Sequence, residues 1–359
     1  MRARWIAVMW AGLALGARAA EMPRGEKVAE GVEKLAYRGW KDCHKLSNPA
    51  CEAIVAPAVG SRVVTFAFKG KNVLFEDRSL DGRVMTPQDH DEENRYWLPW
   101  DGSQPDMFDD KGFRQFYPAW MGAHKVAQAE PFRLITESIP QQPQQGDAHC
   151  VKTFSLDREK PRLAFGYKMV NQGKQPRSWA LLQRTLLPAP GILLLPLKKG
   201  SAFEGGWKIM EPEGGEVLTT GTGKRILERI KEHIIVPVGD CVAVAPQMLG
   251  AKSKVFVFDS ITLHTDGDAG WMAWIAGDVA FVMQFTVESG AKRLRPNVVT
   301  QNWFTSDRME LCPFGPLTEV KPGDSVSFDT VWTFVPLRKA VTDPRDAKGL
   351  RKTIERAIR

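Results

Sequence analysis

Short stretches in which apolar and polar residues strictly alternate constrain this chain more than any other feature of its sequence. In residues 162–170 every second position is apolar, namely Leu163, Phe165, Tyr167 and Met169. Residues 326–334 repeat the pattern, with Val331 as the exception. Alternation with period two is typical of half-buried β-strands, because successive side chains of a strand point to opposite faces of its sheet.

Runs of similar length recur along the chain and are separated by turn signals such as Asn48-Pro49. We expect strands at residues 40–46, 53–57, 62–69, 72–76, 151–156, 162–171, 178–187, 192–197, 233–238, 241–245, 254–259, 271–276, 279–287, 309–314 and 325–335. Many short strands without strand–helix–strand alternation predict an antiparallel all-β architecture. Residues 339–359, with Leu350, Ile354 and Ile358 at helical spacing, predict a terminal amphipathic helix, and residues 224–232 are a candidate for a short helix.

The first 20 residues have the pattern of a secretory signal peptide. Arg2 and Arg4 precede an apolar run at residues 5–16, and Ala17-Arg18-Ala19 forms a cleavage site. An uncleaved anchor is the alternative, but the run is short for a membrane span, and no later run is longer. We therefore expect a periplasmic or secreted protein, with a loose lead-in at residues 21–36, one β domain at 37–338 and the helix at 339–359.

Charge and cysteine content exclude some classes of function. Loss of the signal peptide, which carries three arginines, would lower the formal net charge from +7 to +4, and the basic residues are dispersed, so nucleic-acid binding is not expected. The five cysteines show no zinc-site spacing. Cys43 and Cys51 flank a turn signal in an expected hairpin and are the best disulfide candidates. The alternative is that all five are buried free thiols.

Residues 76–110 interrupt the strand pattern with eleven acidic and three basic side chains, and we expect a long loop there. Its Trp97 and Trp100, with Trp120, fit an aromatic platform for the apolar face of a sugar ring. The acids at residues 89–93 and Asp101 are potential Ca²⁺ ligands, but without a recognisable ligand spacing we favour a solvated acidic loop. No metal or other cofactor is expected.

The C-terminal third carries an ordered set of motifs. A short strand bearing Glu310 is followed by Gly315-Pro316-Leu317, the turn Pro322-Gly323-Asp324 and a strand containing Trp332. Together with Gly60-Ser61-Arg62-Val63, this set resembles galactose-mutarotase-like (aldose 1-epimerase-like) proteins over residues 39–336, and most of all an uncharacterised bacterial secreted family among them. The resemblance implies a large antiparallel two-sheet β-sandwich, with a ligand cleft across the concave sheet.

In mutarotases a Glu near the C-terminus acts as base and a His on a central strand acts as acid. Glu310 matches that Glu, whereas the strand matching the His-bearing one, at residues 177–188, has no histidine. Arg184 on that strand can bind hydroxyls or a carboxylate through its planar fork. The resemblance also implies that Arg62 points into the cleft. The alternatives are a solvated Glu310, an Arg184 ion pair at the sandwich rim and an Arg62 salt bridge beside a turn.

We therefore expect an exported carbohydrate-binding protein without turnover, whose mono- or oligosaccharide cleft is lined by Arg62, Trp97, Trp100, Arg184 and Glu310. The first alternative is a sugar-active enzyme, either an aldose epimerase or a lyase or hydrolase, that uses Glu310 as general base. The second is a structural envelope protein with a vestigial cleft. The sequence favours no particular sugar or oligomeric state.

Overall fold

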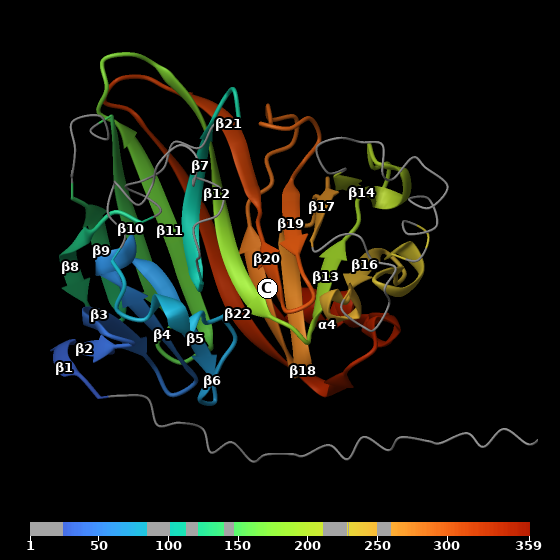
Figure 1. Cartoon of the computed structure of the whole chain (residues 1–359), viewed down its shortest axis with the longest axis horizontal. Helices are drawn as coiled ribbons and strands as arrows, with labels where there is room; N and C mark the ends of the chain where they lie inside the picture. Colours follow the sequence, from blue (N-terminus) through green and yellow to red (C-terminus); the bar gives the residue numbers. More distant parts are fainter. Residues whose placement is uncertain are drawn as a thin grey trace, which may run out of the picture.

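The computed structural model describes residues 24–84, 101–112, 121–139, 147–210, 228, 230–249 and 260–359. In these ranges it contains 22 β-strands in two sheets, and every paired strand is antiparallel to its neighbours (Figure 1). The all-β prediction of a large two-sheet sandwich is confirmed.

The larger sheet has 13 strands. Eleven follow the order β1 (Glu26–Ala29), β2 (Val32–Tyr37), β3 (Trp40–Ser47), β4 (Cys51–Ala56), β5 (Arg62–Phe68), β7 (Ser103–Asp109), β12 (Arg177–Pro188), β20 (Arg308–Leu311), β19 (Thr300–Phe304), β17 (Ile261–Thr265) and β14 (Trp207–Met210). The short β6 (Lys71–Asn72) pairs with β5, and β21 (Phe314–Val320) pairs with β12.

The smaller sheet has nine strands. Their order is β15 (Ile235–Pro237), β16 (Cys241–Val244), β13 (Ile192–Pro196), β18 (Trp271–Phe285), β22 (Ser325–Val341), β11 (Arg162–Asn171), β10 (Ala148–Leu156), β9 (Arg133–Ser138) and β8 (His124–Glu130). The strand expected at 162–171 is β11, and the two expected at 271–276 and 279–287 form the single strand β18. The strand expected at 254–259 lies outside the described residues.

The core lies between the two sheets and is rich in aromatic rings. Phe66 of the larger sheet stacks on Phe334 of the smaller one, with ring centroids 4.5 Å apart, and it meets Trp332 edge to face. Tyr167 on β11 donates a hydrogen bond of 2.7 Å to the carbonyl of Leu182 on β12. The alternating apolar positions of β11 and β22 therefore face inward, as their sequence pattern predicts.

The far face of the smaller sheet is covered by the C-terminal helix α4 (Leu350–Ala357). Ile354 is fully buried in a second apolar cluster with Ile192, Val282 and Val335. The expected terminal helix is present but shorter than residues 339–359, because β22 continues to Val341 and a short 3₁₀ helix (Pro344–Ala347) follows it.

The strand expected at residues 72–76 is reduced to β6. Two further segments that were expected to lack strands contain them. The loose lead-in at residues 21–36 contains β1 and most of β2 in its described part. The expected long loop at residues 76–110 contains β7, which lies near the middle of the larger sheet. In both segments charged residues obscure strands that tertiary pairing stabilises.

The proposed Cys43–Cys51 disulfide is wrong, because all five cysteines are free and buried. The two residues do lie on either side of the β3–β4 hairpin, but its register pairs His44 with Val55 and Ser47 with Glu52. Cys43 is thus several residues away from Cys51 along the ladder. Their side chains also belong to different apolar clusters.

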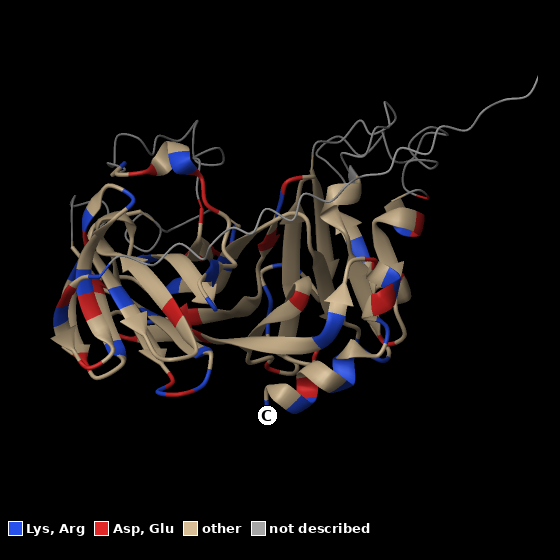
Figure 2. Ribbon diagram, turned by 90° about the horizontal axis from the view of Figure 1, so that it is seen from below, with Lys and Arg blue, Asp and Glu red and all other residues tan. Residues whose placement is uncertain are grey.

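The surface carries mixed charge. Lys and Arg residues are interspersed with Asp and Glu along the described ribbon rather than gathered in a single stripe (Figure 2). Within the described ranges, no helix has both the length and the apolar character needed to cross a membrane. The expected signal peptide at residues 1–20 lies outside these ranges.

Candidate functional site

Glu310 lies on β20, and the alternation of that strand decides where its side chain points. Met309 and Leu311 are part of the core between the sheets. Glu310 therefore faces away from the core, on the outer face of the 13-stranded sheet. It lies between Leu186 on β12 and Trp303 on β19 in the ladder.

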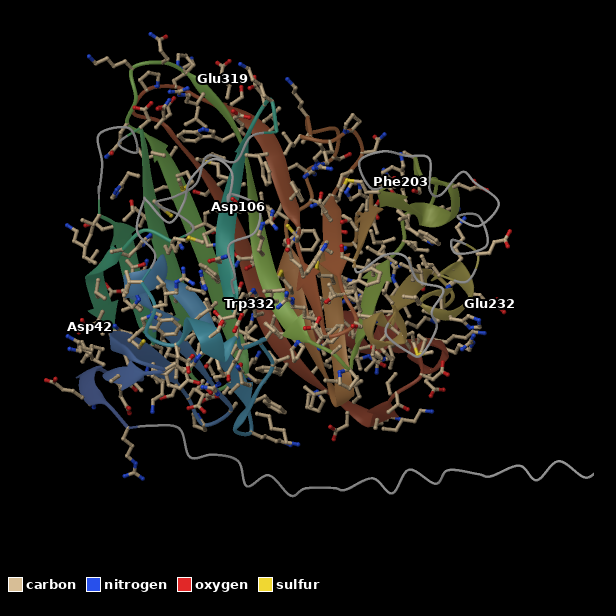
Figure 3. All side chains as sticks on the ribbon, in the orientation of Figure 1. Asp42, Asp106, Phe203, Glu232, Glu319 and Trp332 are labelled. Carbon is tan, nitrogen blue, oxygen red and sulfur yellow. The ribbon has the colours of Figure 1, made fainter. Side chains whose placement is uncertain are left out.

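Arg184 of β12 binds this carboxylate on the same face. Its Nη1 lies 2.8 Å from Oε1 and 3.0 Å from Oε2 of Glu310. Its Nε donates a 2.7 Å hydrogen bond to Oδ2 of Asp106 on β7, near the middle of the larger sheet (Figure 3). One guanidinium thus bridges two carboxylates, and the three side chains come from the adjacent strands β7, β12 and β20. We call Asp106, Arg184 and Glu310 the central triad.

The central triad is almost completely buried, with 0% of Asp106, 7% of Arg184 and 2% of Glu310 exposed. Burial alone would lower the pKa of Arg184, but Glu310 and Asp106 more than offset this, so its pKa lies above the ordinary value. Burial also raises the pKa of the neighbouring Cys312 thiol, and Glu310 raises it further. The guanidinium is therefore charged and Cys312 is a neutral thiol.

Polar and aromatic side chains extend the outer face beyond the central triad. Met210, Thr262, Trp303 and Glu310 are successive cross-strand neighbours on β14, β17, β19 and β20. One step along the strands, Nε2 of His264 lies 3.1 Å from Oε1 of Gln301. Burial, with smaller effects from Arg295 and Lys208, lowers the pKa of His264 to about 4. Its imidazole is therefore neutral at neutral pH.

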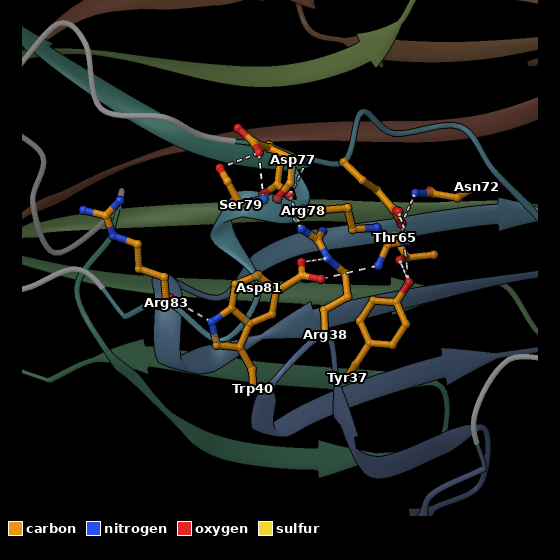
Figure 4. Close-up of polar contacts among 12 residues, drawn as sticks. Tyr37, Arg38, Trp40, Thr65, Asn72, Asp77, Arg78, Ser79, Asp81 and Arg83 are labelled. Carbon is orange, nitrogen blue, oxygen red and sulfur yellow. Dashed lines mark hydrogen bonds and ion pairs between the residues drawn. The ribbon is translucent and has the colours of Figure 1, made fainter.

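Arg62 belongs to a different ionic group. It is 3% exposed, and its Nη1 lies 3.1 Å from Oδ1 of Asp101. Nη2 of Arg38 lies 2.8 Å from the other carboxylate oxygen, and Arg38 also binds Asp81 and the carbonyl of Asp77 (Figure 4). These contacts agree with the salt-bridge interpretation of Arg62. Asp101, weighed in the sequence as a Ca²⁺ ligand, is held by two arginines instead.

The structure thus brings together two of the predicted site residues, Arg184 and Glu310. No hydrogen bond or ion pair joins Arg62 to them in the described part of the chain. Trp97 and Trp100 lie outside the described residues, as do Trp120 and the acids at residues 89–93.

Sequence reasoning missed Asp106 and Trp303. Asp106 was counted with the acids of a long loop, although Gln104, Asp106 and Phe108 occupy alternate positions of β7. Pro105 and the preceding run of acids obscured that alternation. A tryptophan in a strand is usually a core residue, yet Trp303 is only half buried and faces outward beside Glu310.

This two-sheet sandwich has the fold of galactose-mutarotase-like proteins. A galactose mutarotase-like protein from Lactobacillus casei superposes with a TM-score of 0.52, at 9% identity, over 82% of this chain and 100% of that one. A putative aldose 1-epimerase from Escherichia coli K12 gives a TM-score of 0.50 at 12% identity, covering 82% and 99% of the two chains.

The GalM/aldose epimerase homologue from Caenorhabditis elegans also superposes, with a TM-score of 0.50 at 10% identity, over 82% of this chain and 98% of that one. Neither a family model nor a curated protein matches the sequence. At these identities the superpositions establish the fold but not the chemistry.

Proposed function

We propose that this protein binds a carbohydrate on the outer face of the larger sheet, at the central triad and Trp303, without turning it over. Sugar hydroxyls donate to carboxylates and accept from guanidinium groups, and a half-buried indole suits the C–H face of a pyranose. The triad offers both kinds of polar group within three adjacent strands. The signal-peptide pattern of residues 1–20 supports a periplasmic or secreted location for this activity.

The ion pair between Arg184 and Glu310 is the observation that supports binding without turnover. Anomer exchange needs one group that takes a proton and another that gives one. Both oxygens of Glu310 lie within 3.0 Å of Arg184 Nη1, so accepting a proton from a sugar would require this ion pair to open. Arg184 occupies the strand on which the resemblance led us to expect a histidine, and a charged guanidinium is not a proton donor at neutral pH.

An aldose epimerase, or another sugar-active enzyme, is the second candidate. The outward-facing Glu310 on β20 favours it, as does the fold shared with a protein described as a putative aldose 1-epimerase. In that mechanism Glu310 would release Arg184 and act as general base when the sugar binds. His264, on the same face two strands away, is neutral and is the nearest imidazole along the described ladder.

The test compares wild-type protein with Glu310→Gln and Trp303→Leu, using thermal unfolding with and without a panel of sugars. We expect a sugar-dependent rise in Tm of a few degrees in the wild type, because a ligand that binds only the native state stabilises it by mass action. Both variants should lose most of this rise relative to their own sugar-free Tm. Glu319→Gln, at an exposed carboxylate far from the triad (Figure 3), is the control that should keep it.

Polarimetry separates the two candidates. We expect anomer exchange of a bound sugar to proceed at the uncatalysed rate with wild-type protein. Fast exchange that Glu310→Gln abolishes would establish the enzyme and overturn the proposal of binding without turnover. No Tm shift with any sugar would instead favour a structural envelope protein.

A further inference from the structure

Within the described ranges, two arginines beside the central triad have no carboxylate partner. The guanidinium carbon of Arg308 lies 5.1 Å from the ring centre of Phe75 and 5.9 Å from that of Trp303. It makes no salt bridge with any described residue, whereas Arg38, Arg62 and Arg184 each do. Stacked between two rings, this guanidinium keeps its edge, with its N–H donors, available.

Arg295 is the second of these arginines. Its Nη1 lies 2.9 Å from the sulfur of Met210, which is a weak acceptor. Burial lowers the pKa of Arg295, and the positive charge of Arg184 lowers it further. In the described part of the chain no carboxylate compensates this half-buried charge. A guanidinium that is desolvated without a counter-ion is energetically unfavourable, so the site is favourable for an anion.

Both arginines reach the same row of the outer face. Arg295 contacts Met210 and Arg308 stacks on Trp303, and these two residues belong to the cross-strand row that ends at Glu310. The exposed Lys208 lies on this face as the cross-strand neighbour of His264. Four cationic side chains, Lys208, Arg184, Arg295 and Arg308, therefore accompany two carboxylates, Asp106 and Glu310. These six side chains together carry an excess of positive charge, although the central triad by itself is net negative.

We propose that the saccharide bound at this site is acidic, carrying a carboxylate or a sulfate ester that Arg295 and Arg308 hold. This inference rests on the proposed function, because it names the class of sugar that the same site takes. The planar guanidinium fork matches the geometry of either anionic group and can bind it through two parallel hydrogen bonds. The ring of the sugar would then lie on Trp303, with its hydroxyls toward the central triad.

Calorimetric titration at fixed ionic strength tests this proposal by measuring the affinity of the protein for three sugars. The probes are D-galacturonate, D-galactose 6-sulfate and neutral D-galactose, and each is also used as a short oligomer. We expect at least one acidic probe to bind wild-type protein about tenfold or more tightly than its neutral counterpart, which corresponds to one charge-assisted contact. Comparing the uronate with the sulfate ester identifies which anionic group the site prefers. The preference should weaken as salt is raised.

Arg295→Gln and Arg308→Gln should each remove most of the acidic preference, measured in each variant as the ratio of its affinities for the acidic and the neutral probe. Arg338→Gln makes the same charge change at an exposed position of β22 in the other sheet and should retain the preference. Sugar-free Tm values, measured in parallel, show whether the variants remain folded.

The possible failures are distinguishable. If acidic and neutral probes bind wild-type protein equally, the acidic class is wrong and carbohydrate binding stands. If the acidic preference survives in both arginine variants, the assignment to Arg295 and Arg308 is wrong. If no probe binds, the proposed function fails and this inference fails with it.

Discussion

At the scale of single residues, three buried cations are stabilised in three different ways. Arg184 bridges two carboxylates, and Arg62 shares Asp101 with Arg38. Lys152, on β10 and fully buried, donates to the backbone carbonyl of Gly60. Burial nevertheless disfavours the charged form of its ammonium group.

From the burial of Lys152 we predict that the free energy of unfolding rises with pH. Burial lowers its pKa from 10.5 to about 7. Between these two values the unfolded chain binds more protons than the folded one, so the contribution of Lys152 to stability rises with pH, by at most roughly 1.4 kcal/mol per pH unit. Relative to Lys152→Met, wild-type protein should gain more than about 1 kcal/mol in unfolding free energy between pH 7 and pH 9, measured with urea.

Lys168→Met is the matched control, since Lys168 is an exposed residue of the neighbouring strand β11. Its difference from wild type should stay constant over the same pH range. A pH-independent difference for Lys152→Met would mean that the ammonium keeps its ordinary pKa in the folded protein.

At the scale of elements, the docking of α4 shows how one helix completes a sheet. The outer face of the smaller sheet carries apolar residues such as Ile192 and Val282, and α4 covers them with Ile354. An isolated helix of eight residues is unstable in water, so its packing against the sheet stabilises it. The helix and the sheet face depend on each other.

Shortening the buried side chain of Ile354 on α4 should therefore destabilise the protein. We expect Ile354→Ala to lower the unfolding free energy by about 2–4 kcal/mol, through lost burial and the cavity that remains. Lys352→Ala, at an exposed position of the same helix, should change it by less than about 0.5 kcal/mol. Urea denaturation measures both, and equal effects of the two substitutions would show that α4 is not docked as described.

At the scale of the whole molecule, the two sheets bury the cysteines separately instead of cross-linking them. Cys43, Cys51 and Cys312 lie on the larger sheet or directly after one of its strands, whereas Cys150 and Cys241 lie on the smaller one. Burial raises the pKa of Cys43 and of Cys51 to about 12, so both thiols stay protonated and unreactive in the folded protein. The stability of the fold therefore comes from its packed core and its ladders.

Thiol titration checks this arrangement. Without reductant, denatured protein should react promptly with about five equivalents of a thiol reagent, since all five cysteines are free. Native protein should react slowly, at a rate limited by opening of the structure. A count near three in the denatured protein would instead indicate one disulfide.

The sequence by itself determined the fold class and most strands of the core, because period-two alternation reports directly which face of a strand is buried. This is why β11 was predicted with its observed bounds. Alternation did not predict β1 or β7, because both strands contain charged residues that interrupt the apolar pattern. These segments are strands because they pair with neighbouring strands in the sheet. Alternation also does not reveal that Trp303 faces outward, because a tryptophan is apolar on either face of a strand.

Only the tertiary structure decided which side chains meet. Asp106, Arg184 and Glu310 are far apart in the sequence, and their contact depends on β7, β12 and β20 being adjacent in the sheet. It also depends on a register that places all three on one face. The same kind of register separates Cys43 from Cys51, although both belong to one hairpin. Local sequence specifies period and turns, whereas strand order and register are set by burial summed over both sheets.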